Sequence, residues 1–179
     1  MPEQFPSSLE KTRSTTYRLI FLASLLLILV FMSKDLLKHL ASKAPDETFI
    51  TIKGKKIALK DLHGKSVIVT FWATDCPACI KEIPDFIDLY KQYHKQGLEI
   101  IAVAMYYDPP NHVVTLTEER QLPYDVALDL KAEHVQAFGG VQLIPSTFLI
   151  APDGSFALKK TGAVDPLEMK TLIEKLFKG

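Results

Sequence analysis

Cysteine is scarce in this chain, with two residues among 179. A framework of several disulfides is therefore excluded, and so is a zinc site built from thiolates alone, which needs about four ligands. The five histidines are scattered without metal-ligand spacing, so we expect no metal site and no cofactor. Basic and acidic side chains balance at 21 each, which gives no indication of nucleic acid or of a strongly acidic partner.

Long apolar runs are also rare, and the chain has one of them near its N-terminus. Residues 1–16 are polar and predict a disordered tail. Residues 17–33 predict a transmembrane anchor, because a charge-free apolar stretch lies between Arg18 and Lys34, which can reach the membrane surfaces. Residues 34–45 then form a stalk, and residues 46–179 are expected to form one folded domain.

A cleaved signal peptide is the alternative interpretation of this apolar stretch, since such peptides have apolar regions of about 7–15 residues. Ser42-Lys43-Ala44 has small residues at a suitable spacing, but Pro45 follows directly and should block processing. We therefore expect an uncleaved anchor. Three basic residues precede the stretch and three follow it within a short distance, so the count of positive charges does not set the orientation.

Both cysteines occur in one motif, Cys76-Pro77-Ala78-Cys79, directly after the apolar run of residues 66–72, which predicts a buried strand. A C-x-x-C that opens a helix after a strand brings two sulfurs close enough for a disulfide. It also places the first sulfur where the helix N-terminus stabilises a thiolate. Because the thiolate is the form that attacks disulfides, the motif predicts a redox site. A purely structural disulfide is the alternative, but so short a loop constrains the unfolded chain little.

The surroundings of the motif resemble the active-site segment of thioredoxin-like proteins, and above all the membrane-anchored TlpA/ResA/CcmG branch of thiol–disulfide oxidoreductases. Phe71-Trp72-Ala73 precedes the motif, Glu82 follows the second cysteine by three residues, and Pro84 follows it by five. Far downstream, Ile144-Pro145-Ser146-Thr147 resembles the cis-proline strand that faces the C-x-x-C in this family, and Asp153-Gly154 matches the turn after it.

Pattern and resemblance together predict an α/β fold, a thioredoxin-like three-layer sandwich with a mixed sheet and helices on both faces, preceded by the single transmembrane helix. We expect Pro84 to kink the first helix of the domain, Asn111 to cap the second, and Asp165 to cap the last. The expected strands are residues 48–52, 56–59, 66–72, 98–105, 124–128, 146–150 and 155–160, and the expected helices are 77–97, 111–121, 131–138 and the segment from 166 onward.

Position in the motif and the resemblance together assign roles to three residues, and Asp75 is the main departure from the family pattern. Cys76 is expected to be the nucleophile and Cys79 the sulfur that resolves the mixed disulfide. Glu82 is expected to move the proton of Cys79, because Thr70 stands where thioredoxin has a buried aspartate, although a plain surface glutamate is the alternative. Asp75, next to the nucleophile, either raises the pKa of Cys76 by repulsion or only complements the helix N-terminus.

Substrate contact is expected at the cis-proline and around it. Pro145 is predicted to be cis and to hold the substrate backbone, with Ile144 and Trp72 contributing to the contact; a proline at a strand edge is the alternative. The loop of residues 106–110 is expected to contribute to recognition at most.

The resemblance implies an enzyme that reduces protein disulfides outside the cytoplasm, for example in cytochrome c maturation or the rescue of oxidised thiols. It would be held in the inner membrane with its domain on the periplasmic side and would draw electrons from a membrane donor of the DsbD/CcdA type. Three alternatives stay open: a DsbA-type oxidant, a thiol peroxidase, whose P-x-x-x-T-x-x-C signature is absent here, and a copper carrier, which usually has three residues between its cysteines.

Overall fold

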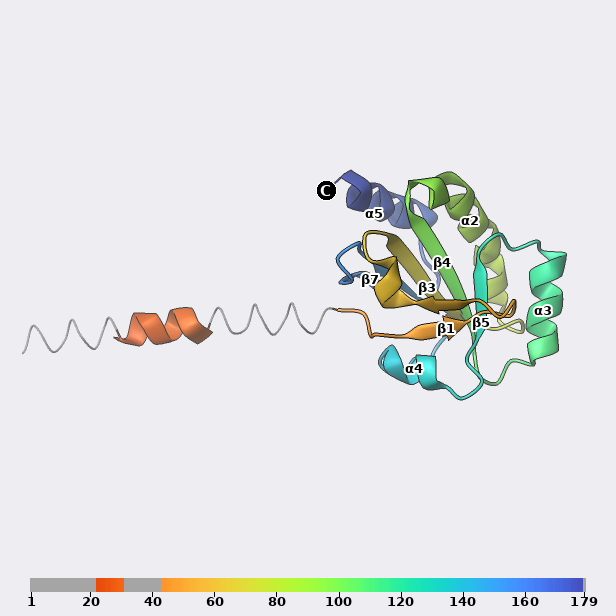
Figure 1. The fold of residues 1–179 in the computed structure, drawn as a ribbon, viewed down its shortest axis with the longest axis horizontal. Helices are drawn as coiled ribbons and strands as arrows, with labels where there is room; N and C mark the ends of the chain where they lie inside the picture. Colours follow the sequence, from red (N-terminus) through yellow and green to blue (C-terminus); the bar gives the residue numbers. More distant parts are fainter. Residues whose placement is uncertain (1–21, 31–42, 179) are drawn as a thin grey trace, which may run out of the picture. The chain divides into compact units, whose positions relative to one another are not determined.

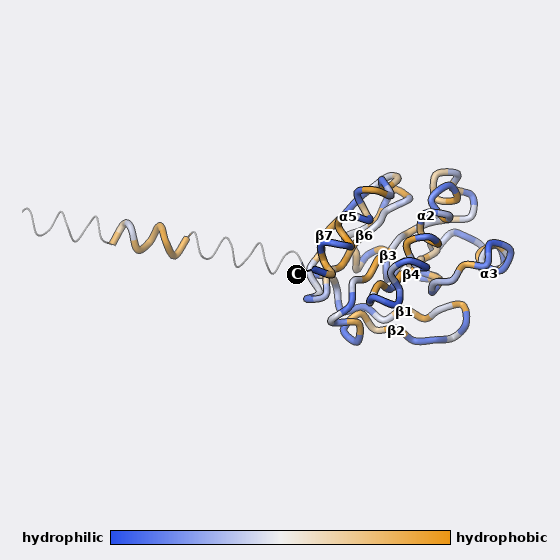
Figure 2. The backbone as a smooth tube through the Cα atoms, turned by 90° about the horizontal axis from the view of Figure 1, so that it is seen from above, coloured by the Kyte–Doolittle hydropathy of each residue, from blue (hydrophilic) through white to orange (hydrophobic). Residues whose placement is uncertain are grey.

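The computed structural model describes residues 22–30 and 43–178, which fall in two separate units divided after Ser42. Residues 22–30 form a helix of mainly hydrophobic residues (Figure 2). Within the described ranges, no helix has both the length and the apolar character needed to cross a membrane. The predicted tail, most of the stalk and both ends of the predicted anchor lie outside the described residues, so these predictions stay untested.

The second unit, residues 43–179, is built on a five-stranded sheet of order β5-β4-β3-β6-β7 (Figure 1). Its elements are β1 (Thr48–Ile50), β2 (Lys56–Ala58), η1 (Leu59–Leu62), β3 (Ser66–Trp72), α2 (Pro77–Tyr93), η2 (His94–Gln96), β4 (Leu98–Ala104), α3 (Pro110–Glu119), β5 (Asp125–Leu128), α4 (Glu133–Ala137), β6 (Ser146–Ile150), β7 (Phe156–Thr161) and α5 (Pro166–Lys178). Strands β3, β4 and β5 are parallel, whereas β6 runs antiparallel to β3 and β7 antiparallel to β6.

This strand order brings several chain segments to one edge of the sheet. The carboxyl ends of the parallel strands β3, β4 and β5 meet there, together with the start of the antiparallel strand β6. Thr70 in β3 is in register with Thr147 in β6, and Trp72 is in register with Ala104 in β4. The loops that leave these strands therefore surround the beginning of α2.

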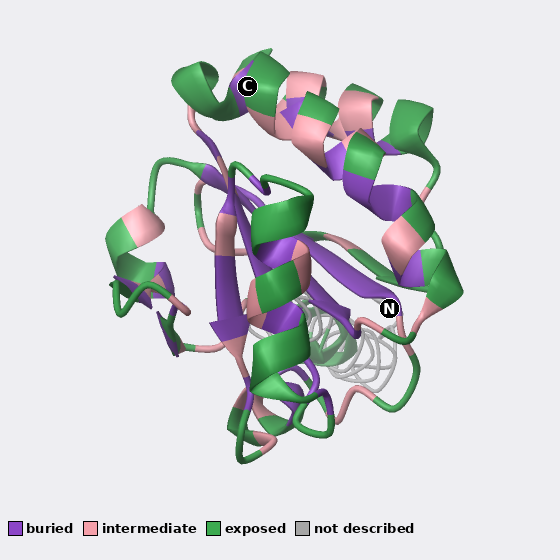
Figure 3. Ribbon diagram, turned by 90° about the vertical axis from the view of Figure 1, so that its right-hand side faces the viewer, coloured by how far each residue is buried: buried purple, intermediate pink, exposed green. Residues whose placement is uncertain are grey.

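Strand β3 is central because both of its faces are buried, as its unbroken apolar and β-branched sequence predicts. Side chains alternate between the faces, so Ile68 and Trp72 pack with α2, α5 and part of α3, while Val69 and Phe71 pack with α4 and the β1–β2 hairpin. Figure 3 shows the buried strands between helices whose outer faces are exposed. The mixed sheet with helices on both faces is thereby confirmed.

Two local expectations need correction. Helix α3 begins at Pro110 with Pro109 at its N-cap and no side-chain cap in the described structure, so Asn111 lies inside the first turn and does not cap it. Proline suits the first helical position because that position needs no N–H. The helix therefore begins at Pro110, earlier in the chain than predicted. In addition, Ala44 donates its N–H to the carbonyl of Gly154 at 2.9 Å, so contacts with the domain begin before the predicted boundary.

Candidate active site

Cys76 and Cys79 form a disulfide across the first turn of α2, with their Cα atoms 5.3 Å apart. Cys76 occupies the N-cap position, and its sulfur accepts the backbone N–H of Cys79 at 3.2 Å. Its side chain is half-buried, whereas Cys79 is 4% exposed. The sulfur at the helix N-terminus is thus the more accessible of the two, as the proposed attacking role of Cys76 requires.

The start of β6 lies beside this disulfide. The Ile144–Pro145 peptide bond is cis, as the motif predicts, and Pro145 lines the same pocket as Cys79. Ile144 is half-buried, while its neighbour Leu143 is 67% exposed. The sequence reasoning named Ile144 and missed Leu143, whose exposure depends on the path of the loop before β6.

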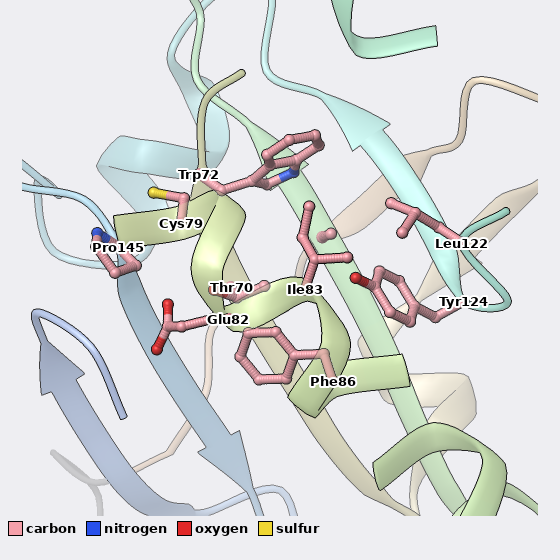
Figure 4. Close-up of a pocket in the computed structure, with 10 residues that line it drawn as sticks. Thr70, Trp72, Cys79, Glu82, Ile83, Phe86, Leu122, Tyr124 and Pro145 are labelled. Carbon is pink, nitrogen blue, oxygen red and sulfur yellow. The ribbon is translucent and has the colours of Figure 1, made fainter. Parts of the chain in front are cut away.

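A small, mainly apolar pocket lies behind the disulfide. Figure 4 shows Cys79, Glu82 and Pro145 on one side of it and Leu122 and Tyr124 on the other. The complete lining is Thr70, Trp72, Cys79, Glu82, Ile83, Phe86, Ala102, Leu122, Tyr124 and Pro145. Burial raises the pKa of Tyr124, so its hydroxyl keeps its proton. Among the lining residues, only Glu82 has a carboxyl group.

Glu82 is 5% exposed, so it belongs to the interior and the surface alternative does not hold. Its Oε1 accepts the backbone N–H of Val164 at 2.6 Å, whereas its buried Oε2 has no hydrogen-bond partner among the described residues. Burial raises the pKa of this carboxyl; the Val164 hydrogen bond opposes the rise and the charge of Asp85 adds to it. Such a group can exchange a proton closer to neutral pH than a solvated glutamate does.

Thr70 and Thr147 share a buried hydrogen bond, with their hydroxyl oxygens 2.9 Å apart. Thr70 stands at the position where thioredoxin has a buried aspartate. In this protein the position is occupied by a neutral hydroxyl, which pairs with Thr147 and so links β3 to β6. The pairing follows from the register of the two strands, which sequence reasoning did not use.

Trp72 belongs to the core of the domain, and the substrate contact expected of it is not seen in this oxidised state. Its side chain is 4% exposed, and its indole N–H has no hydrogen-bond partner within residues 22–30 and 43–178. The ring lines the pocket behind the disulfide, because Trp72 is the last residue of a strand buried on both faces. In this oxidised state Trp72 is therefore a packing residue and does not offer a surface to a substrate.

Asp108 is a residue of the site region that the sequence reasoning left unassigned. Its buried carboxylate accepts the backbone N–H of Thr74 at 2.6 Å and the hydroxyl of Thr74 at 2.7 Å. Thr74 lies in the turn that leads into Cys76, where the N–H of Cys76 bonds to the carbonyl of Ala73. Asp108 thus fixes this turn to the loop that follows β4. No cluster of three or more potential metal ligands occurs in the described part of the chain.

A disulfide across the first turn of a helix, beside a cis-proline strand, is the arrangement of thioredoxin-like disulfide oxidoreductases, and the chain is of this class. A crystal structure of a thiol:disulfide interchange protein of the thioredoxin family from Chlorobium tepidum TLS matches with a TM-score of 0.70 and 26% identity, covering 76% of this chain and 96% of that chain.

Sequence comparison identifies the family. A model described as the AhpC/TSA family matches residues 40–158. The thiol-disulfide oxidoreductase ResA of Bacillus cereus (strain ATCC 10987 / NRS 248) is 31% identical over 169 residues, which cover 89% of this chain and 96% of the relative. ResA of Bacillus subtilis (strain 168) is 34% identical over 135 residues, covering 75% and 74%. The chain belongs to the AhpC/TSA family.

Proposed function

We propose that this protein reduces disulfides in other proteins. The name of its ResA relatives, thiol-disulfide oxidoreductase, supports thiol–disulfide exchange but not its direction. The charge around the attacking sulfur is the observation that supports reduction over oxidation of the substrate. The two residues between the cysteines, Pro77 and Ala78, are neutral, and Asp75 directly before the motif is an exposed carboxylate. Nothing cationic in this segment stabilises the thiolate beyond the helix N-terminus itself.

The reaction needs the dithiol form of the protein. The thiolate of Cys76 attacks one sulfur of the substrate disulfide, that S–S bond breaks, and the other substrate sulfur leaves as a thiolate that takes up a proton. Cys79 then loses its proton to Glu82 and attacks the Cys76 sulfur, which releases the second substrate thiol. Two electrons have passed to the substrate, and the protein holds the Cys76–Cys79 disulfide. A dithiol donor must reduce this disulfide before the next cycle.

Two residues are proposed to support these steps without exchanging electrons. Pro145, beside Cys79, is proposed to hold the backbone of the substrate together with Ile144. Glu82 lies one helical turn beyond Cys79 in the same pocket, and its raised pKa suits a group that first accepts a proton and later returns it.

The reduction potential tests the direction. Strong oxidants of the DsbA type have a stabilised reduced form, at about −120 mV, whereas thioredoxin lies at about −270 mV. Because Asp75 and Glu82 add negative charge near the sulfurs, we expect the reduced form to be disfavoured and the potential to lie nearer that of thioredoxin. Equilibration of the protein in glutathione buffers, followed by trapping of thiols, measures it. A value near that of DsbA would reject the reductase and favour the oxidant.

Two other activities fit the residues less well. A thiol peroxidase signature would need Thr three residues and Pro seven residues before the reactive cysteine, where this chain has Ala73 and Val69. A copper carrier would need a further ligand near the two thiols, and the described structure shows no such cluster.

We also propose that the protein is anchored by residues 17–33 in the inner membrane, with its domain on the periplasmic side. The charge-free apolar stretch between Arg18 and Lys34 supports an anchor, and the resemblance to the TlpA/ResA/CcmG branch supports the orientation. A membrane dithiol donor of the DsbD/CcdA type would then return the protein to its reduced form.

A further inference from the structure

Three segments surround the disulfide at one edge of the sheet, and together they contain no basic residue. These segments are residues 73–80, 104–110 and 141–147. Their charged residues are Asp75 and Asp108. A substrate that approaches Cys76 therefore meets negative charge and no lysine or arginine in the segments that frame the disulfide.

Basic residues also lie just outside these segments. In β7, the exposed Lys160 is in register with Thr147 of β6. Lys81 is two residues beyond Cys79 on α2, about 200° around the helix axis. Since Cys79 faces the interior, the Lys81 side chain faces solvent on the far side of α2. Lys131 follows β5, two strands away from β3, and lies 3.9 Å from Glu133.

The two carboxylates at this edge differ in what they can do. Asp108 is buried, and both of its oxygens accept hydrogen bonds from Thr74. Asp75 is exposed and stands directly before Cys76. Asp75 is therefore the carboxylate that a substrate can reach.

Two exposed tyrosines lie in the loop that Asp108 fixes to the turn of Asp75. Tyr106 is 52% exposed and Tyr107 50% exposed, and their rings meet edge to face with centroids 5.3 Å apart. Partial burial raises the pKa of Tyr107, and the charges of Asp75 and Asp108 raise it further, so the phenol lies within the field of Asp75. Exposed aromatic faces and a carboxylate both attract cations.

We propose that Asp75 and the Tyr106–Tyr107 pair form a subsite for a cationic side chain, so that this protein prefers protein disulfides with Lys or Arg next to the attacked cysteine. This inference rests on the proposed reductase function and names the substrate class. The carboxylate supplies the charge, and the ring faces cover the aliphatic stem of the bound side chain. The Asp108–Thr74 hydrogen bonds hold the two parts of the subsite beside Cys76.

Peptide substrates test this preference directly. Three synthetic peptides carry one disulfide each and differ only beside the attacked cysteine, where they have Arg, Gln or Glu. Oxidation of the reduced full-length protein is followed by thiol trapping. We expect the Arg peptide to react faster than the Glu peptide by about fivefold at low salt, because one exposed charge pair has roughly that effect. The ratio should approach one in 1 M salt, where the screening length is about 3 Å.

Variants assign the preference to these residues. Asp75→Asn should lower the Arg-to-Glu rate ratio to below about twofold, and Tyr107→Leu should lower it by about twofold. Any general change in Cys76 reactivity affects all three peptides alike, so the Gln peptide serves as the internal reference. Asp61→Asn removes an exposed carboxylate at the opposite end of β3 and should leave the ratio unchanged.

The outcomes separate this inference from the function on which it rests. Equal rates for the Arg and Glu peptides, or an unchanged ratio in Asp75→Asn, would overturn the cationic subsite while leaving the reductase intact. Failure of the reduced protein to react with any of the peptides would instead count against the reductase itself.

Discussion

Glu82 is an acidic side chain in an apolar pocket, one helical turn from a redox-active sulfur. Burial raises its pKa above the ordinary value of 4.5, which an unfolded chain approaches. The folded protein therefore binds a proton at pH values where the unfolded chain has already released it. Between these two pKa values, stability falls as the pH rises, and the full cost of the buried charge is present above the folded pKa.

The Glu82→Gln variant should remove this pH dependence. The glutamine side chain can still accept the Val164 N–H but carries no charge, so the stability of the variant relative to the parent should grow as the pH rises from about 4 to about 8. Urea unfolding of residues 43–179 at several pH values measures the difference. Asp61→Asn, an exposed carboxylate, is the control and should show no such trend; parallel curves for Glu82→Gln and the parent would contradict a raised pKa.

The same variant examines the proposed proton transfer. If Glu82 accepts the proton of Cys79, replacing it should shift the pH dependence of Cys79 alkylation in the reduced protein. Superimposed profiles would leave Glu82 with a structural role only, through its bond to the segment before α5.

At the scale of elements, α5 closes the face of the sheet on which α2 lies. Met169 and Ile173 are fully buried there, and Val164, just before the helix, binds Glu82 of α2. Asp165 caps α5 by accepting the N–H of Leu167 at 2.8 Å, as the sequence predicts. The C-terminal helix thus closes the core, and the segment directly before it binds the carboxylate of the site.

Removing a buried side chain from α5 should therefore be costly. Ile173→Ala should lower the free energy of unfolding by about 2–5 kcal/mol, and Ile173→Val by about 1 kcal/mol, because the side chain is fully buried. Leu167→Ala on the exposed side of the same helix should change it by less than about 0.5 kcal/mol. Chemical denaturation of the oxidised proteins measures all three. Similar losses for Ile173→Ala and Leu167→Ala would argue against this packing.

At the scale of the whole molecule, the chain divides into a unit of residues 1–42 and a unit of residues 43–179. The proposed anchor belongs to the first unit and the redox site to the second. The function proposed here requires both, because an anchor keeps the site on the side of the membrane where disulfides persist.

The anchor gives a prediction about the full chain. Expressed in a bacterial host, residues 1–179 should sediment with membranes and resist alkaline extraction, whereas residues 43–179 should remain soluble. After reduction, a membrane-impermeant maleimide should label the cysteines of the full chain from the periplasmic side. Extraction at alkaline pH, or labelling only after lysis, would contradict the anchor or its orientation.

Local sequence was sufficient to determine much of this protein. The buried strand of residues 66–72, the helix that starts after Cys76 and the cap at Asp165 follow from residue periodicity and from capping chemistry, which act over a few residues. The cis bond at Pro145 followed from the resemblance of its surrounding segment to a known motif.

The environment of the site was decided by tertiary structure. Glu82 is joined to Val164, 82 residues away, and Thr74 to Asp108, 34 residues away. Such contacts leave no periodic pattern in either partner. The resemblance therefore assigned a role to Glu82, but the sequence predicted neither its bond to Val164 nor the fixed loop. Trp72 is likewise interior because α2 covers the end of β3, and only the assembled layers show which residues a substrate can reach.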